Sequence, residues 1–351
     1  MSLAELRVEN LRCIESAALE FAPELNVIAG ENGAGKTSIL EAIFLLGRGR
    51  SFRTRTNERL IRHGQAALTV FGRTRDGPAK AAGVEVSREG TRARINGQSV
   101  HTLLELSSVL PVQAIDPEIH KLIEQGPERR RRWLDWLVFH VEPSFASQWA
   151  RYQRALKQRN AALKTGAFDV SVWDPVLIEA GHSISTARQA ALGRLRPYLE
   201  RLFTAFSDLS VDVGFHAGWA ADRTLEEQLR ANIERDRDRG LTHSGPHRAD
   251  VDLRMKGRIA REVLSRGQQK LTAVAMIVAQ LQLLRAELGM RATLLLDDPA
   301  AELDAKNLRR LFDELAALES QMIATSLTPE TALFQAPKAT FHVEQGRVIR
   351  L

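Results

Sequence analysis

Hydrophobic positions near the start of the chain recur at every second residue or form short continuous runs, as they do in β-strands. Leu6 and Val8 alternate with polar residues, and an apolar run covers 25–29. A longer apolar stretch at 36–46 predicts a helix that stops at Gly47. The other elements expected here are strands at 68–72, 83–87 and 109–115 and a hairpin turn at Asn96-Gly97. This mixture predicts an α/β region at the start of the chain.

After Pro117 the apolar residues recur at every third or fourth position, which indicates helices. The clearest stripe consists of Leu177, Ala180, Ile184, Ala187, Ala191, Leu195, Leu199 and Leu202. A helix that carries this stripe is expected to bend at Pro197. The α/β pattern returns after Gly240, with a helix at 270–288, a strand at 292–296, a helix at 304–318, a strand at 322–325, and two strands within 340–351 that join at Gln345-Gly346.

These patterns predict one α/β head built from both ends of the chain, residues 1–116 and 240–351. A helical domain at 117–239 is inserted in that head. Because the sequence sustains no heptad and no internal repeat, the insert is expected to be compact and not a coiled-coil arm.

Composition narrows the class of protein. With 351 residues, 44% hydrophobic and 26% charged, the chain is typical of a soluble globular protein and not of a disordered, collagen-like or disulfide-framed one. The net charge of +6 favours a localised basic patch, which makes nucleic acid a candidate partner. The single Cys13, the charged first twenty residues, and the short, glutamine-interrupted apolar stretch 271–284 favour a soluble cytoplasmic protein.

Candidate chemistry begins with a phosphate-binding loop between a predicted strand and a predicted helix. The segment Gly30, Glu31, Asn32, Gly33, Ala34, Gly35, Lys36 and Thr37 matches G-x-x-x-x-G-K-[ST]. Backbone N–H groups and the helix N-terminus would face the phosphates. Lys36 would neutralise the β- and γ-phosphates, and Thr37 would hold Mg²⁺.

Two further motifs fit an NTPase. Asp297 and Asp298 follow an apolar strand, so Asp297 is the Mg²⁺ candidate and Asp298 the general base or water-positioning group. Ser265 stands at the entrance of the long apolar helix, where a helix N-terminus would bind another phosphate. Alternatively, the two acids form a solvated strand end, and Ser265 is an ordinary helix N-cap.

The order of these motifs resembles the ABC-type ATPases of the SMC group and, more closely, the RecF family of bacterial recombination mediators. The matching segments are 30–37, 47–52, 126–135, 157–163, 245–250, 264–270 and 297–304. The resemblance implies an ABC-type P-loop ATPase head with an inserted helical domain. Four positions depart from the usual family pattern: Leu11 and Cys13, where the family usually has Phe-Arg-Asn around Arg12, together with Pro299 and Ala301.

The resemblance also implies site roles. ATP would lie between two subunits, with the P-loop of one facing Ser265, Gly267 and Gln268 of the other. Arg12 would lie near the nucleotide, Gln113 near the metal with Thr37 and Asp297, and Asp304 in a loop at the dimer interface. The implied protein is a slow, DNA-stimulated ATPase of DNA repair and the SOS response. Its ATP-driven homodimer would bind duplex and gapped or junction DNA and help RecO and RecR to load RecA.

The arginine-rich stretch after the P-loop helix is the candidate DNA contact. This basic segment contains Arg48, Arg50, Arg53, Arg55, Arg59 and Arg62. Arginines contact phosphates without reading sequence. A second run, 129–132, is either another DNA contact or a set of salt bridges between the insert and the head. His243, His247 and Arg248 are expected to belong to a structured turn before a strand.

Two other functions remain open at the level of the sequence. The chain could be the ATP-binding subunit of a membrane transporter, but the long insert between the P-loop and Ser265 counts against that class. It could also be a clamp that binds ATP and dimerises without significant hydrolysis, which only kinetics would distinguish from an ATPase.

Overall fold

A computed structural model of the protein describes residues 2–75, 80–100, 102–166, 169–207, 210–299, 304–316, 318–328 and 337–351. Contacts divide the chain into two compact units. Unit 1 consists of Met1–Ile119 and Arg285–Leu351, and unit 2 of His120–Leu284. Residues 240–284, which the sequence assigns to the head, thus lie in unit 2, and the division into lobes at 117 and 240 stays a prediction.

Unit 1 contains a mostly parallel sheet with the strand order β15-β14-β3-β13-β12-β8. Its strands are β3 (Leu25–Ala29), β8 (Val112–Ile115), β12 (Thr293–Leu296), β13 (Met322–Ser326), β14 (Ala339–Glu344) and β15 (Arg347–Arg350). Every neighbouring pair of strands is parallel except β14 and β15, which are antiparallel. The carboxyl ends of β3, β12 and β13 therefore lie at one edge of the sheet, which is where ligands bind in such folds.

A second sheet of unit 1 is antiparallel, with the order β2-β1-β4-β5-β6-β7. Its strands are β1 (Leu3–Leu11), β2 (Ile14–Glu20), β4 (Ala67–Thr74), β5 (Ala81–Ser87), β6 (Gly90–Ile95) and β7 (Gln98–Ser99). Asn96 and Gly97 both have positive φ between β6 and β7, so the predicted hairpin turn is confirmed. Sequence reasoning did not predict β2.

Helix α1 (Lys36–Arg48) shares one hydrophobic core with residues of both sheets. It is apolar on nearly all sides, as expected of a helix covered all round. The prediction that it stops at Gly47 is wrong, because Gly47 lies inside the helix, where a Cβ would come within 2.5 Å of the Leu110 carbonyl oxygen. Gly49 ends the helix with a φ of 64°. Short 3₁₀ helices follow at η1 (Asn57–Leu60) and η2 (Leu103–Ser108), and α11 (Ala305–Ala316) also belongs to this unit.

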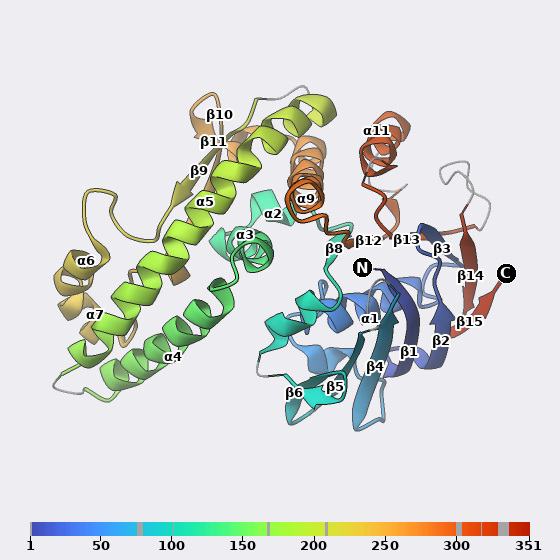
Figure 1. The fold of residues 1–351 in the computed structure, drawn as a ribbon, viewed down its shortest axis with the longest axis horizontal. Helices are drawn as coiled ribbons and strands as arrows, with labels where there is room; N and C mark the ends of the chain where they lie inside the picture. The colour runs from blue at the N-terminus through green and yellow to red at the C-terminus, as the bar shows by residue number, and fades with distance from the viewer. Residues whose placement is uncertain are drawn as a thin grey trace. The chain divides into compact units, whose positions relative to one another are not determined.

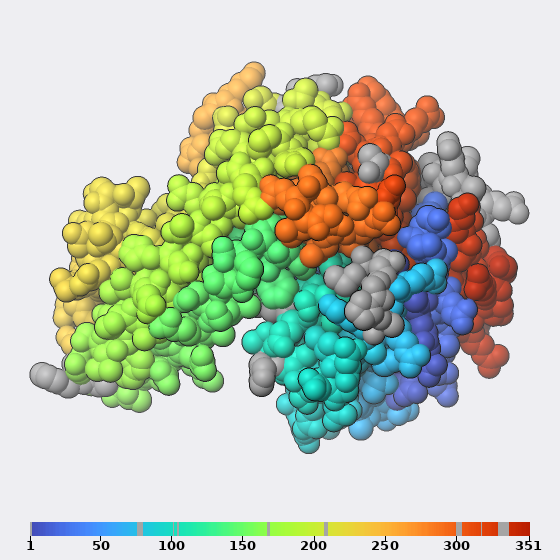
Figure 2. Space-filling view, in the orientation of Figure 1, coloured from blue at the N-terminus to red at the C-terminus, as the bar shows by residue number. Residues whose placement is uncertain are grey.

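Unit 2 is mainly helical. Its helices are α2 (Lys121–Glu124), α3 (Pro127–Val141), α4 (Phe145–Lys164), α5 (Asp174–Ser207), α6 (Leu225–Ala231), α7 (Ile233–Arg239), α8 (Ala260–Val263) and most of α9 (Arg266–Leu288), with 3₁₀ turns η3 (Ser171–Trp173) and η4 (Pro246–Arg248). The last turn of α9, from Arg285, is assigned to unit 1. Figure 1 shows the long helix α5. The helix continues through Pro197, and the residues of the predicted apolar stripe are buried except for Ala187, which is partly buried. A bend at Pro197 stays a prediction. Figure 2 shows α4, in green, lying along α5, in yellow-green.

A small antiparallel sheet of β9 (Asp212–His216), β10 (Asp250–Met255) and β11 (Arg258–Ile259) completes unit 2. The strand β9 was not predicted. Helix α9 is long and apolar enough to cross a membrane, but two thirds of its most apolar stretch is buried inside the protein. Its Met276 carbonyl accepts a hydrogen bond from the indole of Trp133, and Gln280 donates to the Trp133 carbonyl, as in a core helix.

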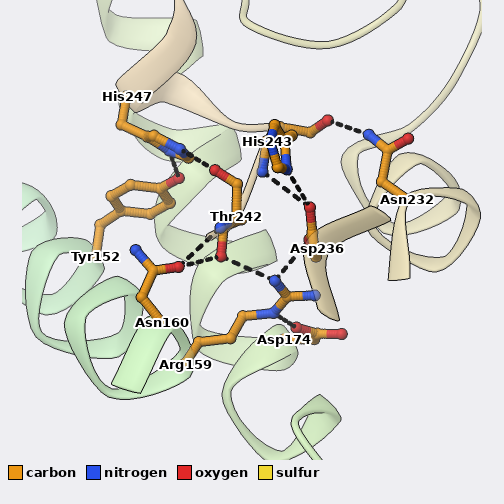
Figure 3. Close-up of polar contacts among 10 residues, drawn as sticks. Tyr152, Arg159, Asn160, Asp174, Asn232, Asp236, Thr242, His243 and His247 are labelled. Carbon is orange, nitrogen blue, oxygen red and sulfur yellow. Dashed lines mark hydrogen bonds and ion pairs between the residues drawn. The ribbon is translucent and has the colours of Figure 1, made fainter. Parts of the chain in front are cut away.

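A buried polar network ties the helices of unit 2 to the chain before β10 (Figure 3). Arg159 of α4 is fully buried and donates to Asp174, Asp236 and Thr242. His247 donates from Nε2 to the Thr242 carbonyl and accepts at Nδ1 from the Tyr152 hydroxyl. The structured turn predicted around His243 and His247 is confirmed, because η4 leads directly into β10.

Candidate nucleotide-binding site

The P-loop connects the carboxyl end of β3 to the first turn of α1, as the sequence predicts. Gly30 lies so close to β14 that a Cβ would stand 2.2 Å from the Val343 carbonyl oxygen, and its φ of 155° is in the region that favours glycine. The Gly30 N–H donates to the Ser326 carbonyl of β13. The loop is therefore fixed on neighbouring strands, with the N-terminus of α1 at its end.

Lys36 lies at the start of α1 and turns back over the loop. Its Nζ donates to the carbonyl oxygens of Gly30, at 2.6 Å, and Glu31, at 2.9 Å. Burial lowers the pKa of Lys36, and the negative charges of Asp298 and Asp297 oppose that change. An ammonium group held over this loop is suited to donate hydrogen bonds to phosphate oxygens.

Two of the predicted magnesium residues, Thr37 and Asp297, meet at the carboxyl end of β12. Thr37 Oγ1 donates a 2.9 Å hydrogen bond to Oδ1 of Asp297. Thr325 Oγ1, at the end of β13, donates to the same oxygen at 3.0 Å and accepts the N–H of Asp298. Burial raises the pKa of Asp297, and the hydrogen bonds from Thr37 and Thr325 oppose this effect.

Asp298 has a φ of 47°, in the left-handed region that few non-glycine residues adopt. Its backbone is held there by the bond to Thr325. The two adjacent carboxyl groups both line the cavity but have different surroundings: Asp297 is buried and accepts from two hydroxyl groups, whereas Asp298 is partly exposed. This difference fits the separate roles predicted for them.

A cavity of about 660 Å³ opens over these groups within unit 1. Its lining includes Arg12, Cys13, Glu31, Asn32, Gly33, Gly35, Lys36, Thr37, Ser38, Arg53, Asp116, Pro117, Glu118, Asp297, Asp298, Thr325 and Leu327. The volume lies within the range of small-molecule and cofactor sites. The donor set fits Mg²⁺ with a nucleoside triphosphate, because a hydroxyl and carboxylates stand beside a loop of backbone N–H groups and a lysine.

Two residues that the resemblance assigns to this site differ in position. Arg12 lines the cavity and forms an ion pair with Glu41 of α1. Gln113 is buried within β8, opposite Leu294 of β12, and does not border the cavity. The strand continues past Gln113 to Ile115 and is followed by Asp116, which does line the cavity. A role for Gln113 at the metal stays a prediction.

Ser265, Gly267 and Gln268, which the resemblance assigns to the nucleotide of the other subunit, lie in unit 2 at the N-terminus of α9. The N–H of Ser265 donates to the Gln268 side chain, and the N–H of Gln268 donates to Ser265 Oγ. Ser265 thus caps the N-terminus of α9, and its contact with a phosphate stays a prediction. Ser265 and Gly267 are exposed.

In unit 1, Asp304 is exposed and accepts from Asn307 at the start of α11, which lowers the pKa of Asp304. Ala301 lies outside the described residues, and Pro299 is buried.

The basic segment has members with different environments. Arg53 lines the cavity, and Arg48 lies over the Phe44 ring. Arg62 donates to the Cys13 carbonyl and pairs with Glu15. Arg55 and Arg59 are exposed, and Arg50 is partly exposed. Sequence reasoning grouped all of these arginines as DNA contacts, whereas the structure brings Arg53 to the nucleotide cavity.

The second arginine run serves the packing of unit 2. Arg130 donates to both carboxylate oxygens of Asp250, which joins α3 to β10. Arg131 donates to the Ala249 carbonyl. Arg129 and Arg132 bond within their own chain segment, to Gln125 and Glu128. Arg130 therefore forms a salt bridge as predicted, but its partner Asp250 lies in unit 2 as well, so a salt bridge between the insert and the head stays a prediction.

Thr325 is a site residue that sequence reasoning missed. The sequence predicts a short strand that ends at Thr325. In a parallel sheet the end of that strand lies beside the end of the strand that leads to Asp297, so Thr325 could have been placed at the site. Arg53 gave no such signal, since nothing local distinguishes it from the other arginines of the basic segment.

Comparison with known proteins agrees with this site. The model of the RecF/RecN/SMC N terminal domain matches residues 2–348. The chain belongs to this family. The RecF resemblance and the predicted fold class are confirmed, because relatives and solved structures named RecF match nearly the whole chain. It is 41% identical over 362 residues to "DNA replication and repair protein RecF" of Stutzerimonas stutzeri (strain A1501), covering 100% of this chain and 98% of that relative.

Other members of the RecF/RecN/SMC family extend the comparison. The protein of the same name from Cellvibrio japonicus (strain Ueda107) is 38% identical, with 99% of each chain covered. A solved structure described as "Structure of the recombination mediator protein RecF-ATP in RecFOR pathway" has a TM-score of 0.90 at 26% identity, covering 99% of this chain and 97% of that one. An SMC head bound to part of ScpA matches with a TM-score of 0.58 at 16% identity, which supports the fold alone.

Proposed function

We propose that this protein is a DNA-binding ATPase of DNA replication and repair. The observation that carries the proposal is the contact of Thr37 with Asp297 beside Lys36, in a cavity large enough for a nucleotide. The names of its relatives supply the biological process, since they are called DNA replication and repair proteins.

ATP is the proposed nucleotide. The P-loop N–H groups and Lys36 would hold the phosphates, with Arg12 and Arg53 at the cavity wall. Support comes from the similar solved structure, which is described as RecF-ATP. Thr37 and Asp297 would hold Mg²⁺, which neutralises charge that develops on the phosphates.

Hydrolysis is assigned to Asp298. Its carboxyl group borders the cavity next to the metal candidates, where it would orient a water molecule and accept its proton. We expect turnover to be slow and to rise when DNA binds. A clamp that binds ATP without hydrolysis would differ from this protein in its turnover alone.

The proposed active form is an ATP-driven homodimer. Ser265, Gly267 and Gln268 of one subunit would contact the nucleotide held by the other, and Asp304 would lie at the interface. The exposure of Ser265 and Gly267 at a helix N-terminus supports a phosphate contact in trans.

Duplex and gapped or junction DNA are the proposed partners, contacted through the exposed arginines of the basic segment. By family membership, RecR and RecO would act with this protein to load RecA, in the cytoplasm. The similar RecF structure, which is described as belonging to the RecFOR pathway, supports RecR and RecO as partners. The full-length match to repair proteins favours this function over a transporter subunit.

The deciding experiment is sedimentation of the protein with and without ATP and Mg²⁺, repeated with gapped duplex DNA. A dimer that requires ATP, and that sediments with DNA, is expected. ATP hydrolysis would be measured on the same samples. A monomer under all conditions would contradict the dimer, and ATP binding without detectable turnover would favour the clamp.

A further inference from the structure

Glu41 carries a buried negative charge next to the nucleotide cavity without lining it. Its side chain is fully buried on α1, one turn after Thr37. Oε1 accepts a 3.0 Å hydrogen bond from Arg12, whose Nε also lies 2.7 Å from Oε2. A buried carboxylate is costly unless it is paired, so Glu41 and Arg12 depend on each other.

Ser51 connects this pair to the basic segment. Its hydroxyl group donates to Glu41 Oε1 at 2.6 Å and accepts the backbone N–H groups of Arg53 and Thr54 at 2.9 and 3.1 Å. One donor and two acceptor positions are thus filled, which is the full capacity of a hydroxyl group. Ser51 therefore connects the backbone at Arg53 and Thr54 to the Glu41 carboxylate that pairs with Arg12.

Arg53 is held less firmly than Arg12. Its Nη1 lies 3.6 Å from Glu41 Oε2, and its side chain is 47% exposed, whereas that of Arg12 is 28% exposed. Oε2 is buried but receives no well-aligned hydrogen bond. Arg53 also lines the nucleotide cavity, and its charge lowers the pKa of Asp297 against the effect of burial. Phosphates in the cavity would therefore compete with Glu41 for Arg53 before they compete for Arg12.

We propose that Glu41 is a positioning residue through which nucleotide binding and DNA binding influence each other. When a triphosphate binds, Arg53 moves from Glu41 toward the phosphates. Ser51 connects the backbone at Arg53 and Thr54 to Glu41. The movement of Arg53 away from Glu41 therefore also reorients the arginines that follow Thr54. Glu41 keeps Arg12 in both states. The part of this inference that concerns DNA affinity rests on the proposed function. The part that concerns the movement of the basic segment rests on nucleotide binding alone.

The test uses the full-length chain and the variant Ser51→Ala, which removes the connection but leaves Glu41 and Arg12 in place. Ser107→Ala is the matched control, because Ser107 is also a buried serine beside α1 and donates to the Gly47 carbonyl at 3.0 Å. Hydrogen exchange of the peptide 54–60 would be measured with and without a non-hydrolysable ATP analogue and Mg²⁺. Affinity for duplex DNA would be measured in the same two states.

In the parent protein and in Ser107→Ala, the analogue is expected to slow exchange in 54–60 and to change DNA affinity by about fivefold or more. In Ser51→Ala both changes should disappear, while the analogue binds as tightly as it does to the parent. Glu41→Gln should lose both changes and also bind the analogue more weakly, because Arg12 is no longer held by a full charge.

Parental responses in Ser51→Ala would overturn the inference, as would an equal loss in Ser107→Ala, which would indicate a general effect of disturbing α1. If the parent binds no DNA but shows the exchange response, the DNA-binding function fails and the connection through Glu41 stands. If the parent binds DNA and shows neither response to the analogue, the connection fails and DNA binding stands.

Discussion

Thr37 and Asp297 are joined by a 2.9 Å hydrogen bond, although they come from opposite ends of the chain. The bond links the first turn of α1 to the end of β12, and Thr325 donates to the same carboxylate oxygen from β13. While the Thr37 hydroxyl group donates to Asp297, its oxygen keeps two lone pairs that can bind a metal. Thr37 and Asp297, two of the three predicted magnesium residues, are thus already adjacent in the fold.

Asp297→Asn is expected to weaken Mg²⁺-dependent ATP binding by about tenfold or more, because an amide oxygen carries no full charge for the metal. Calorimetric titration of ATP at fixed Mg²⁺ checks this. Asp313→Asn, which alters an exposed carboxyl group of α11, is the control and should bind as the parent does. Equal affinities in the parent and Asp297→Asn would remove Asp297 from the metal site.

Asp298→Asn should have the opposite profile. ATP and DNA binding should persist, while hydrolysis falls by about a hundredfold or more, since a general base contributes to turnover and not to ground-state binding. Single-turnover hydrolysis, followed beside nucleotide affinity, separates the two effects. Parental turnover in Asp298→Asn would show that another group positions the water.

Lys36→Met should weaken ATP binding by about ten- to a hundredfold and abolish the ATP-dependent dimer, because the phosphates lose a charged hydrogen-bond donor. Sedimentation velocity at increasing ATP and Mg²⁺ measures both changes. Lys256→Met, at an exposed position of unit 2, is the matched control. A Lys36→Met protein that still dimerises with ATP would contradict the proposed sandwich.

The P-loop and the strands around it could be predicted because their signals are local. The strand Leu25–Ala29 and the helix start at Lys36 follow from adjacent residues, and the structure has both at those positions. The end of α1 was missed because the packing of Gly47 against Leu110 depends on a distant segment. The strands β2 and β9 were missed because their pattern of apolar and polar residues was too weak to distinguish them from the residues around them.

The same limit applies to the candidate site. Glu41 reads as an ordinary polar position in an apolar helix, and its importance follows from its contacts with Arg12 and Ser51. Likewise, arginines of one segment share a charge but not a function. Arg53 borders the nucleotide cavity, whereas Arg55 and Arg59 face solvent. Sequence spacing cannot separate such neighbours, because the turn that orients them is fixed by long-range bonds.

Because Arg53 borders the nucleotide cavity and Arg55 and Arg59 do not, the prediction on DNA binding concerns Arg55 and Arg59. Arg55→Gln with Arg59→Gln should weaken duplex binding for all sequences alike, because phosphate contacts carry no base information. The slope of log affinity against log salt should flatten by about 0.9 for each lost contact, which filter binding or fluorescence anisotropy would measure.

ATP affinity should be unchanged in the Arg55 and Arg59 variant, since neither residue lines the cavity. Arg88→Gln with Arg94→Gln removes the same charge from exposed positions of unit 1 and is the control. If both double variants flatten the slope equally, net charge and not the basic segment governs binding.

The last prediction concerns the pH dependence of stability and rests on His247. Burial lowers the pKa of His247 to about 4, from 6.5 for an exposed histidine. The folded protein therefore keeps His247 neutral at acidities where the unfolded chain binds a proton. The unfolded state then binds more protons, so stability should fall as the pH drops from 6.5 toward about 4, and this contribution should not change above 6.5.

The shift corresponds to a loss of about 3 kcal/mol over that interval. Urea unfolding at several pH values would measure it as the difference between the parent and His247→Gln, which cannot titrate but can hydrogen bond with Tyr152 and Thr242. The variant should lose less stability than the parent on acidification. His63→Gln, at an exposed position, should follow the parent curve. If the His247→Gln curve runs parallel to the parent curve between pH 6.5 and 4, His247 titrates normally and the buried network of Figure 3 does not exclude its proton.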